Sequence, residues 1–259
     1  MSVAEPMDLP RPGSSAYLTI GWPSPHTFLS IISSIGGCID FMELGIPAKR
    51  PIYDGPVIRL THREASGLAS GLRGAVTLAR EAGIRLGKPV ILMSYLSEFG
   101  GDVKALVEAA AQAEAISVLS PDLLFEYFDR IGDYIDVIRM YGMKPSFFVS
   151  SKFPHKILSK LASTNPLLIY LGLQPATGVK LPVAIYRNLR LARSIIGPRT
   201  YLLAGFSIRT PEAAESVVMA GADAVVVGSE VVRRYRSGGL DSVANLLCSI
   251  RKALVVSVG

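Results

Sequence analysis

Short apolar runs alternate along the chain with longer segments in which apolar residues recur every three or four positions. Runs of the first kind are typical of buried strands, and segments of the second kind are typical of helices that bury one face. The predicted strands are Ala16–Ile20, Ile39–Glu43, Pro89–Met93, Ile116–Leu119, Ser146–Val149, Leu167–Leu171, Tyr201–Ala204 and Ala224–Val227. The predicted helices are His26–Ile35, Val57–Ala82, Asp102–Ala113, Leu124–Tyr141, His155–Ala162, Val183–Ile195, Pro211–Met219 and Leu240–Leu254.

Eight strands alternating with helices in 259 residues predict an α/β fold, a single-domain (β/α)8 TIM barrel over residues 1–259. An open, doubly wound sheet is the structural alternative, but it would normally carry a glycine-rich fingerprint after its first strand. Here Gly21-Trp22-Pro23 follows that strand. No linker, low-complexity tract or change of composition indicates a second domain.

The charge and hydropathy of the chain indicate which kinds of partner to expect: nucleic acid, membrane or small molecule. The formal net charge is +6, but Lys and Arg are spread out, apart from Arg233-Arg234-Tyr235-Arg236, which is typical of a solvated helix end. Without a basic stripe that carries interleaved aromatic residues, we expect no nucleic-acid partner. No apolar stretch reaches membrane-spanning length and the acidic, proline-rich start is not a signal peptide, so we expect no membrane association. A diffuse positive field fits an anionic small substrate.

The two cysteines, Cys38 and Cys248, lie far apart, and neither belongs to a CxxC pair or to a metal-ligand spacing. They predict reduced thiols and a cytoplasmic protein. No group of His, Asp and Glu has metal-ligand spacing, so we expect no metal. Asn and Gln are scarce, and the depletion of these thermolabile amides is a hint of a thermophilic source.

Two carboxylates near the second predicted strand form the first candidate site. Glu43 closes the strand, and Asp54 follows in a loop flanked by Gly55 and Pro56. The carboxyl ends of parallel strands carry the chemistry of α/β proteins, and two converging acids can divide general acid and general base work. The alternatives are structural: Asp54 could cap the helix that starts near Val57, and Glu43 could belong to a buried ion pair.

Glycine and hydroxyl residues after the sixth, seventh and eighth strands form the second candidate site. Backbone N–H groups that glycine leaves accessible, together with hydroxyls and a helix N-terminus, bind phosphate in many barrels. The alternatives are ordinary tight turns and, after the sixth strand, an ordinary connection rather than a lid. The residues concerned are Thr177, Gly178, Gly205, Ser207, Gly228 and Ser229.

Other candidates lie at strand ends or in helices. Three side chains form either an apolar wall for a substrate or part of the core: Tyr17, Met93 and Tyr95. Three histidines lie in predicted helices away from strand ends, and we interpret them as structural or exposed: His26, His62 and His155. Ser150-Ser151 after the fifth strand is typical of helix capping, with a substrate contact as the alternative.

These motifs together resemble the α subunit of tryptophan synthase nearly end to end. The most specific part is Glu43-Leu44-Gly45-Ile46-Pro47, followed by Asp54-Gly55-Pro56 at the family's spacing. Three further segments follow in the family's order: Pro175-Ala176-Thr177-Gly178, Gly205-Phe206-Ser207 and Val227-Gly228-Ser229. The short sixth loop and the brief N-terminus resemble the archaeal branch.

The resemblance implies a barrel lyase of tryptophan biosynthesis that cleaves indole-3-glycerol phosphate to indole and glyceraldehyde 3-phosphate, a retro-aldol reaction without a cofactor. It implies that Glu43 protonates the indole carbon and takes a proton from the glycerol hydroxyl. Asp54 would hydrogen-bond the indole N–H, and Tyr170 would lie near the glycerol part. The implied indole and phosphate contacts are Tyr17, Met93, Tyr95, Thr177, Gly178, Gly205, Ser207, Gly228 and Ser229.

The resemblance also implies a partner, the pyridoxal-phosphate β subunit, which receives indole through a tunnel in an α-β-β-α complex. The chain departs from the family in the loop that normally communicates with this partner, where Ala48-Lys49-Arg50-Pro51-Ile52 replaces Phe-Ser-Asp-Pro-Leu. The sixth loop is also shorter, and Ser207 stands in place of a common glycine. We therefore expect altered coupling to the β subunit and an intact pair of acids.

Two other hypotheses stay open. The chain could be a weakly active binding module that mainly docks on and activates the β subunit. It could also be another phosphate-binding barrel enzyme, such as a prenyl-glyceryl-phosphate synthase or an indole-glycerol-phosphate synthase. These enzymes would share the glycine turns but would not need Glu43 and Asp54 at this spacing, and a ring-closing synthase would carry lysines at strand ends that have none here.

Overall fold

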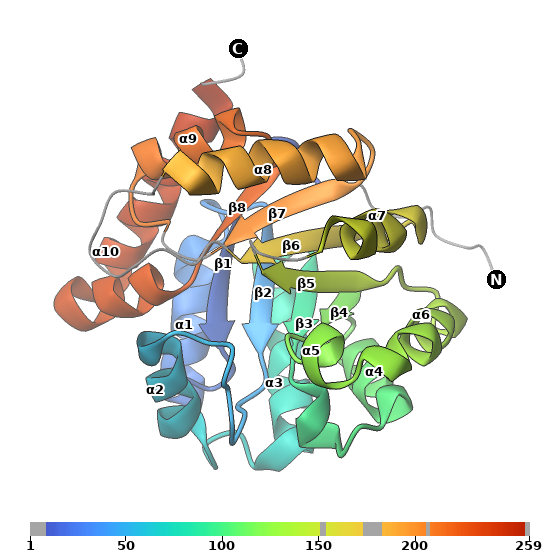
Figure 1. Ribbon diagram of the computed structural model, residues 1–259. Coiled ribbons are helices and arrows are strands. Elements are labelled where there is room, and N and C mark those ends of the chain that lie inside the picture. The colour runs from blue at the N-terminus through green and yellow to red at the C-terminus, as the bar shows by residue number, and fades with distance from the viewer. Residues whose placement is uncertain (1–8, 151–153, 173–182, 206–207, 257–259) are drawn as a thin grey trace.

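A computed structural model describes residues 9–150, 154–172, 183–205 and 208–256. Parallel strands form one eight-stranded sheet in the order β4-β3-β2-β1-β8-β7-β6-β5, which confirms the predicted (β/α)8 barrel (Figure 1). The strands are β1 Gly13–Thr19, β2 Phe41–Gly45, β3 Val90–Met93, β4 Ser117–Leu119, β5 Ser146–Ser150, β6 Leu168–Gly172, β7 Tyr201–Gly205 and β8 Ala224–Val227. We call the carboxyl ends of the strands the mouth of the barrel and the opposite end its base.

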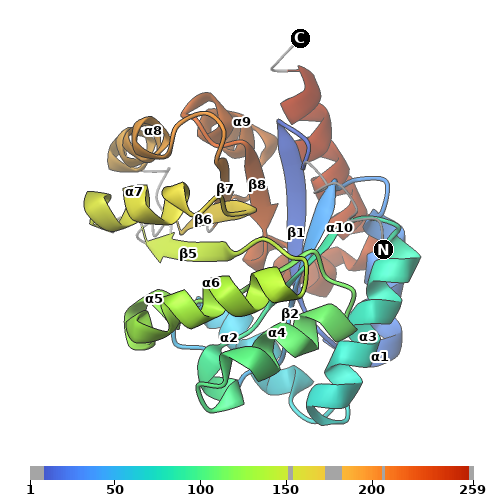
Figure 2. The same ribbon diagram turned by 90° about the vertical axis from the view of Figure 1, so that its right-hand side faces the viewer.

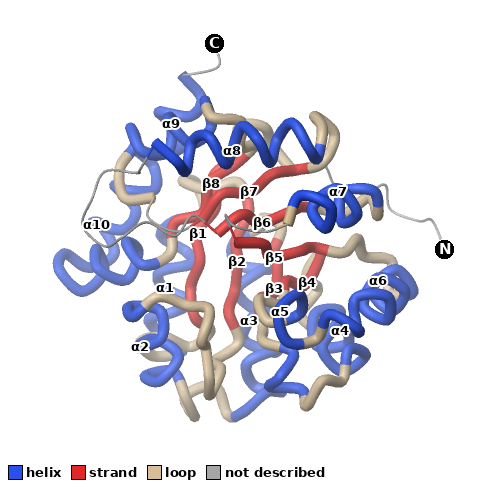
Figure 3. The backbone as a smooth tube through the Cα atoms, viewed as in Figure 1, coloured by secondary structure: helices blue, strands red, loops and turns tan. Residues whose placement is uncertain are grey.

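Helices form an outer layer around the strands (Figure 3). Their apolar faces cover the sheet, which explains the three-to-four-residue period of the sequence. The α-helices are α1 Pro25–Ile35, α2 Pro56–Ala65, α3 Gly71–Leu86, α4 Val103–Gln112, α5 Leu123–Glu126, α6 Ile131–Met140, α7 His155–Ser163, α8 Val183–Ile196, α9 Pro211–Met219 and α10 Ser229–Val256. Two 3-10 helices are η1 Leu96–Phe99 and η2 Phe128–Arg130. In the described part of the chain, no helix is long and apolar enough to cross a membrane.

Local sequence fixes where several helices begin. The Ser24 side chain accepts a hydrogen bond from Thr27 N–H at the start of α1, and Pro25 follows at the first helical position. Asp102 caps α4 and Thr210 caps α9 in the same way. A side-chain acceptor satisfies a backbone N–H that has no partner within the helix, and each such cap contributes about 1 kcal/mol.

Side chains join β4 to β5, the two strands between which the sheet has no backbone ladder. Tyr134 of α6 is fully buried, and its hydroxyl donates to the Val118 carbonyl of β4 while accepting from Ser146 N–H of β5 at 3.0 Å. The Ser117 and Ser146 hydroxyls lie 2.7 Å apart across the same seam. A helix side chain thus completes the ring at its weakest junction.

The structure divides two of the predicted helices. The segment predicted as one helix over Val57–Ala82 forms α2 and α3, because Gly67 and Ser70 between them take positive φ angles of 83° and 54°. Left-handed backbone stops a helix. The segment Leu124–Tyr141 likewise forms α5, η2 and α6. The last helix begins at Ser229 rather than near Leu240 and changes direction at a pair of non-helical glycines, Gly238 and Gly239.

The prediction of two reduced cysteines is wrong, because Cys38 and Cys248 form a disulfide. Cys38 lies just before β2, and Cys248 lies on α10, which runs along β1 (Figure 2). Arg251, almost one helical turn further on, donates to the Gly37 carbonyl and pairs with Asp40. Packing of the last helix against the base brings together two cysteines that spacing alone could not pair.

Candidate active site

Glu43 lies in the middle of β2, two residues before the strand ends, and not at its last position as predicted. The alternation of side chains along the strand turns it into the barrel, opposite in direction to Met42 and Leu44. Its side chain is 1% exposed, and neither carboxyl oxygen has a hydrogen-bond partner among the described residues. Burial, and next the nearby Asp54 carboxylate, raise the pKa of Glu43 to about 8. A carboxyl group in this setting carries its proton at neutral pH.

Asp54 does not cap the following helix. The N-cap of α2 is Gly55, and no side chain caps that helix. The Asp54 carboxylate instead accepts a hydrogen bond from the Tyr95 hydroxyl at 2.8 Å and is buried. Arg59 binds the Asp54 main-chain carbonyl, not its carboxylate. The structure therefore rules out the capping interpretation and places the carboxylate beside Tyr95 and His62.

Tyr95 follows β3 and connects the Asp54 loop to the next strand. Its hydroxyl accepts from Tyr53 N–H at 3.1 Å and donates to Asp54. Burial, and next the Asp54 charge, raise the pKa of Tyr95. Tyr53 stacks on Phe125 with a centroid separation of 4.9 Å, and Met93 ends β3 as a buried residue. These side chains form an apolar, aromatic wall beside Asp54.

Two tyrosines each lie over a glycine of the neighbouring strand, Tyr17 of β1 over Gly45 of β2 and Tyr170 of β6 over Gly205 of β7. A Cβ atom on Gly45 would lie 2.0 Å from the Tyr17 hydroxyl, and one on Gly205 would lie 1.8 Å from the Tyr170 hydroxyl. Both glycines are required because any side chain there would displace a ring. Burial and the two carboxylates raise the pKa of Tyr17 and of Tyr170, so both phenols stay protonated near the acids. Gly205 thus has a packing role, which the sequence did not reveal.

The residues predicted to hold phosphate are only partly described. Gly228 follows β8, and its carbonyl accepts from Val231 N–H at the start of α10. Ser229 is the first residue of that helix, so the N-terminus of α10 opens at the mouth. A helix N-terminus offers unpaired N–H groups and a positive dipole end to an anion. The other residues of that prediction lie outside the described residues: Thr177, Gly178 and Ser207.

His62 is the residue that sequence reasoning missed. It lies on α2, is 2% exposed, and places Nε2 3.1 Å from the Tyr17 hydroxyl and 3.5 Å from Asp54 Oδ2. Its Nδ1 accepts from Ala48 N–H at 2.9 Å. His26 and His155 are exposed, in agreement with the interpretation of the histidines as structural or exposed. The signal available was spacing: Ile58, Thr61, His62 and Ala65 share the buried face of α2.

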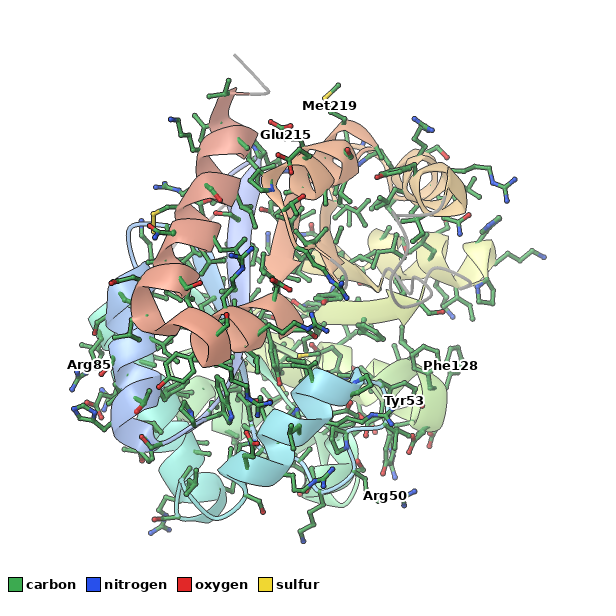
Figure 4. The ribbon with its side chains drawn as sticks, turned by 90° about the vertical axis from the view of Figure 1, so that its left-hand side faces the viewer. Arg50, Tyr53, Arg85, Phe128, Glu215 and Met219 are labelled. Carbon is green, nitrogen blue, oxygen red and sulfur yellow. A yellow bond between two sulfur atoms is a disulfide. The ribbon has the colours of Figure 1, made fainter. Side chains whose placement is uncertain are left out.

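The altered loop after β2 forms the rim of a pocket of about 470 Å³ on the outside of the barrel. Lys49 and Arg50 are exposed, and Figure 4 shows the Arg50 side chain at the outer edge of the molecule with Tyr53 of the same loop further in. His62 belongs to the lining of this pocket.

Among the described residues, no group of three or more His, Cys, Asp or Glu could hold a metal ion. For Ser150, the helix-capping interpretation is not supported, because the N-cap of α7 is Pro154.

Fold and site together define a (β/α)8 barrel enzyme whose mouth holds a protonated, buried acid beside a second carboxylate. The sequence model of the tryptophan synthase alpha chain matches residues 11–251. The chain therefore belongs to the tryptophan synthase alpha chain family, whose members are lyases that cleave indole-3-glycerol phosphate.

Relatives and solved structures agree with this assignment. The chain is 28% identical over 239 residues to the tryptophan synthase alpha chain of Saccharolobus solfataricus, covering 92% of this chain and 95% of that one. It is 32% identical over 251 residues to the alpha chain of Laribacter hongkongensis, covering 92% and 91%. A variant α subunit from Pyrococcus furiosus superposes with a TM-score of 0.83 at 25% identity, covering 96% and 99%. For the tryptophan synthase α2β2 complex of that organism the TM-score is 0.81 at 25% identity, covering 95% and 99%.

Proposed function

We propose that Glu43 and Asp54 carry out the retro-aldol cleavage of indole-3-glycerol phosphate in this chain. The observation that carries this assignment is the Glu43 carboxyl group, buried without a hydrogen-bond partner among the described residues and with its pKa raised to about 8. A protonated acid that no protein group occupies is suited to deliver a proton to a carbon atom. Asp54 lies close enough for its charge to raise that pKa.

Glu43 acts twice in the reaction. As an acid it gives its proton to the indole carbon that bears the side chain, which makes this carbon tetrahedral and the ring nitrogen positive. Asp54 accepts the indole N–H and stabilises the positive charge. The Glu43 carboxylate then takes the glycerol hydroxyl proton, the carbon–carbon bond breaks with its electron pair returning to the ring, and the aldehyde forms. The carboxyl group is regenerated, so no other reactant is consumed.

The remaining residues position the substrate. Tyr17, Met93 and Tyr95 line the indole ring, and Tyr170 lies beside the glycerol part. Gly228 and Ser229 bind the phosphate at the N-terminus of α10, in support of which that helix begins directly after β8. Four residues complete the phosphate site in this proposal: Thr177, Gly178, Gly205 and Ser207.

The chain works with a β subunit in this proposal. The tryptophan synthase of Pyrococcus furiosus is an α2β2 complex with mutual activation. We infer an α-β-β-α assembly for this chain too, with pyridoxal phosphate held by the β subunit and no cofactor in the α chain. A cytoplasmic location suits a biosynthetic enzyme. The disulfide fits this location only in a hyperthermophile, whose intracellular proteins are rich in disulfides.

An indole-release assay tests the proposal. The purified chain is given indole-3-glycerol phosphate, first alone and then with a cognate β subunit. We expect equal amounts of indole and glyceraldehyde 3-phosphate, and the ratio of the two rates measures the coupling left by Lys49 and Arg50. A folded sample that releases no indole in either mixture refutes the lyase assignment. If that sample still activates the β subunit, the chain is a docking module.

A further inference from the structure

His62 occupies a fixed place between the barrel wall and the Asp54 loop. It lies on α2 beside Thr61, whose hydroxyl is 2.7 Å from that of Thr19 on β1 and donates to the Ile58 carbonyl. The helix is thereby fastened to β1 at the level of His62. The imidazole is buried, so each of its ring nitrogens needs a hydrogen-bond partner.

Its Nδ1 has a partner that can only donate. Ala48 N–H points at Nδ1 over 2.9 Å. A backbone amide carries no lone pair for this purpose, so Nδ1 must be the acceptor and the ring proton must lie on Nε2. The hydrogen bond from Ala48 N–H to Nδ1 therefore makes Nε2 a hydrogen-bond donor toward the site.

The Nε2–H group faces the catalytic carboxylate. It donates to the Tyr17 hydroxyl at 3.1 Å and lies 3.5 Å from Asp54 Oδ2, which is an electrostatic contact and not a full hydrogen bond. Oδ2 also accepts from Tyr95 at 2.8 Å. Tyr95 and His62 each accept from an amide of the loop after β2 and each lie beside Asp54 Oδ2, Tyr95 as its hydrogen-bond donor and His62 as an electrostatic contact.

Uncharged hydrogen-bond donors beside Asp54 suit the lyase reaction, in which this carboxylate must stabilise a positively charged ring. Among the described residues, no Lys or Arg side chain pairs with the Asp54 carboxylate, and Arg59 reaches only its main-chain carbonyl. A cationic partner would compensate the charge that must stabilise the positive ring in the transition state. His62 and Tyr95 instead fix the orientation of the carboxylate and leave its charge available.

We propose that His62 is a positioning residue of the lyase reaction, which transmits the position of the loop at Ala48 to Asp54 through its ring. This inference rests on the proposed function. His62 also lines the pocket rimmed by Lys49 and Arg50, and it contacts the Asp54 carboxylate, whereas Arg59 of the same pocket reaches only the Asp54 main-chain carbonyl. A partner that moves this loop moves the carboxylate with it.

Two substitutions separate the functions of the ring. His62→Asn keeps an acceptor near Nδ1 and loses the Nε2 donor, whereas His62→Gln keeps a donor near Nε2 and loses the acceptor. We expect His62→Asn to lower kcat about 10- to 100-fold with KM nearly unchanged, since a small misplacement of a catalytic group has an effect of this size. We expect His62→Gln to retain more kcat but to lose much of the activation by the β subunit. His26→Asn, on the exposed start of α1, is the matched control.

A direct measurement on the unaltered protein guards against variants that fail to fold. Isotope-labelled histidine reports by its ring-nitrogen shifts which nitrogen carries the proton, and we expect Nε2. A proton on Nδ1, or on both nitrogens at the assay pH, overturns the proposal. The proposal is also overturned if His62→Asn and His62→Gln fold, lose kcat equally, and show kcat losses in proportion to their losses of melting temperature. An unaltered chain that releases no indole refutes the proposed function instead, and the labelling result then still decides the tautomer.

Discussion

Two acids three residues apart, one just before β2 and one within it, have opposite surroundings. Asp40, just before β2 at the base, has a side chain 10% exposed. It accepts from Ser14 N–H at 2.9 Å and pairs with Arg251 at 3.0 Å. Glu43, three residues further on, is more deeply buried and has no hydrogen-bond partner among the described residues. The acid at the base therefore has hydrogen-bond partners, whereas the acid inside the barrel has none among the described residues.

The difference separates a stabilising acid from a reactive one within a short segment of the chain. A buried carboxylate that is fully paired holds elements together, as Asp223 also does at the base by binding Arg193 and Leu202 N–H. An unpaired one costs folding free energy, and a folded protein retains such a group where it is used. Positions at the C-terminal face of a barrel read as catalytic and those at the other face as stabilising, and here three residues separate the two.

The largest expected effect is the loss of activity in Glu43→Gln. The amide has nearly the shape of the protonated acid but cannot donate to carbon or take a proton back, so the lyase rate should fall by at least about 1,000-fold. The melting temperature should not fall, because no hydrogen bond is lost. Indole release and a thermal melt on one sample check both statements. Turnover near that of the unaltered enzyme would contradict the assignment of Glu43.

Removal of the disulfide tests the base. Replacing Cys38 and Cys248 by Ser should lower the free energy of unfolding by about 3–5 kcal/mol, since the bond closes a long loop. Indole release at a temperature where both forms are folded should stay within about twofold, because the bond lies far from Glu43. Denaturant melts of the two forms give the difference. A large loss of kcat in the folded double variant would show that the disulfide at the base affects the chemistry at the mouth.

Asp40→Asn, just before β2, is the matched counterpart of Glu43→Gln. It removes the charge that pairs with Arg251 and weakens the hydrogen bonds from Ser14, which should lower the free energy of unfolding by about 2–3 kcal/mol. We expect kcat of the folded variant to stay within about twofold. In the same melt and the same assay, Asp40→Asn should lose stability and keep kcat, whereas Glu43→Gln should keep stability and lose kcat. If both variants lose the same property, the comparison is wrong.

The gradual effect among these predictions is a pH dependence. The pKa of Glu43 is about 8 in the folded chain and near 4.5 when exposed, so the folded state binds more protons between these values. The contribution of Glu43 to stability is therefore present below about pH 4.5 and is lost as pH rises toward 8, by up to about 1.4 kcal/mol per pH unit. Melts of the unaltered chain and Glu43→Gln across this range should diverge accordingly. The value of kcat/KM should fall above about pH 8, where the acid loses its proton.

The sequence was sufficient for the barrel and for naming Glu43 and Asp54, which the structure brings close enough to interact, as one candidate site. Each strand is a buried run that alternating helices cover, so hydropathy alone located all eight within a few residues. Glu43 could be found because an acid inside an apolar run is unusual. The capping role considered for Asp54 was wrong, because Tyr95, from the next strand, takes its carboxylate, and only the folded structure brings the two together.

Features that depend on contacts between distant segments could not be predicted. The break between α2 and α3 depends on left-handed backbone at Gly67 and Ser70, which the helical period hides. His62 has the spacing of an ordinary core residue, and its role depends on Ala48 N–H and Asp54. The disulfide joins segments 210 residues apart, and no local pattern encodes that proximity.

The bond between Cys38 and Cys248 also turns most of the chain into a covalent ring. Seven strands, β2 to β8, lie within this ring, and β1 enters it from outside. A protease that cuts one loop inside the ring therefore opens it without releasing a fragment, and α10 stays attached to the base together with Arg251. The oxidised chain survives a single cut as one molecule, whereas the reduced chain becomes two.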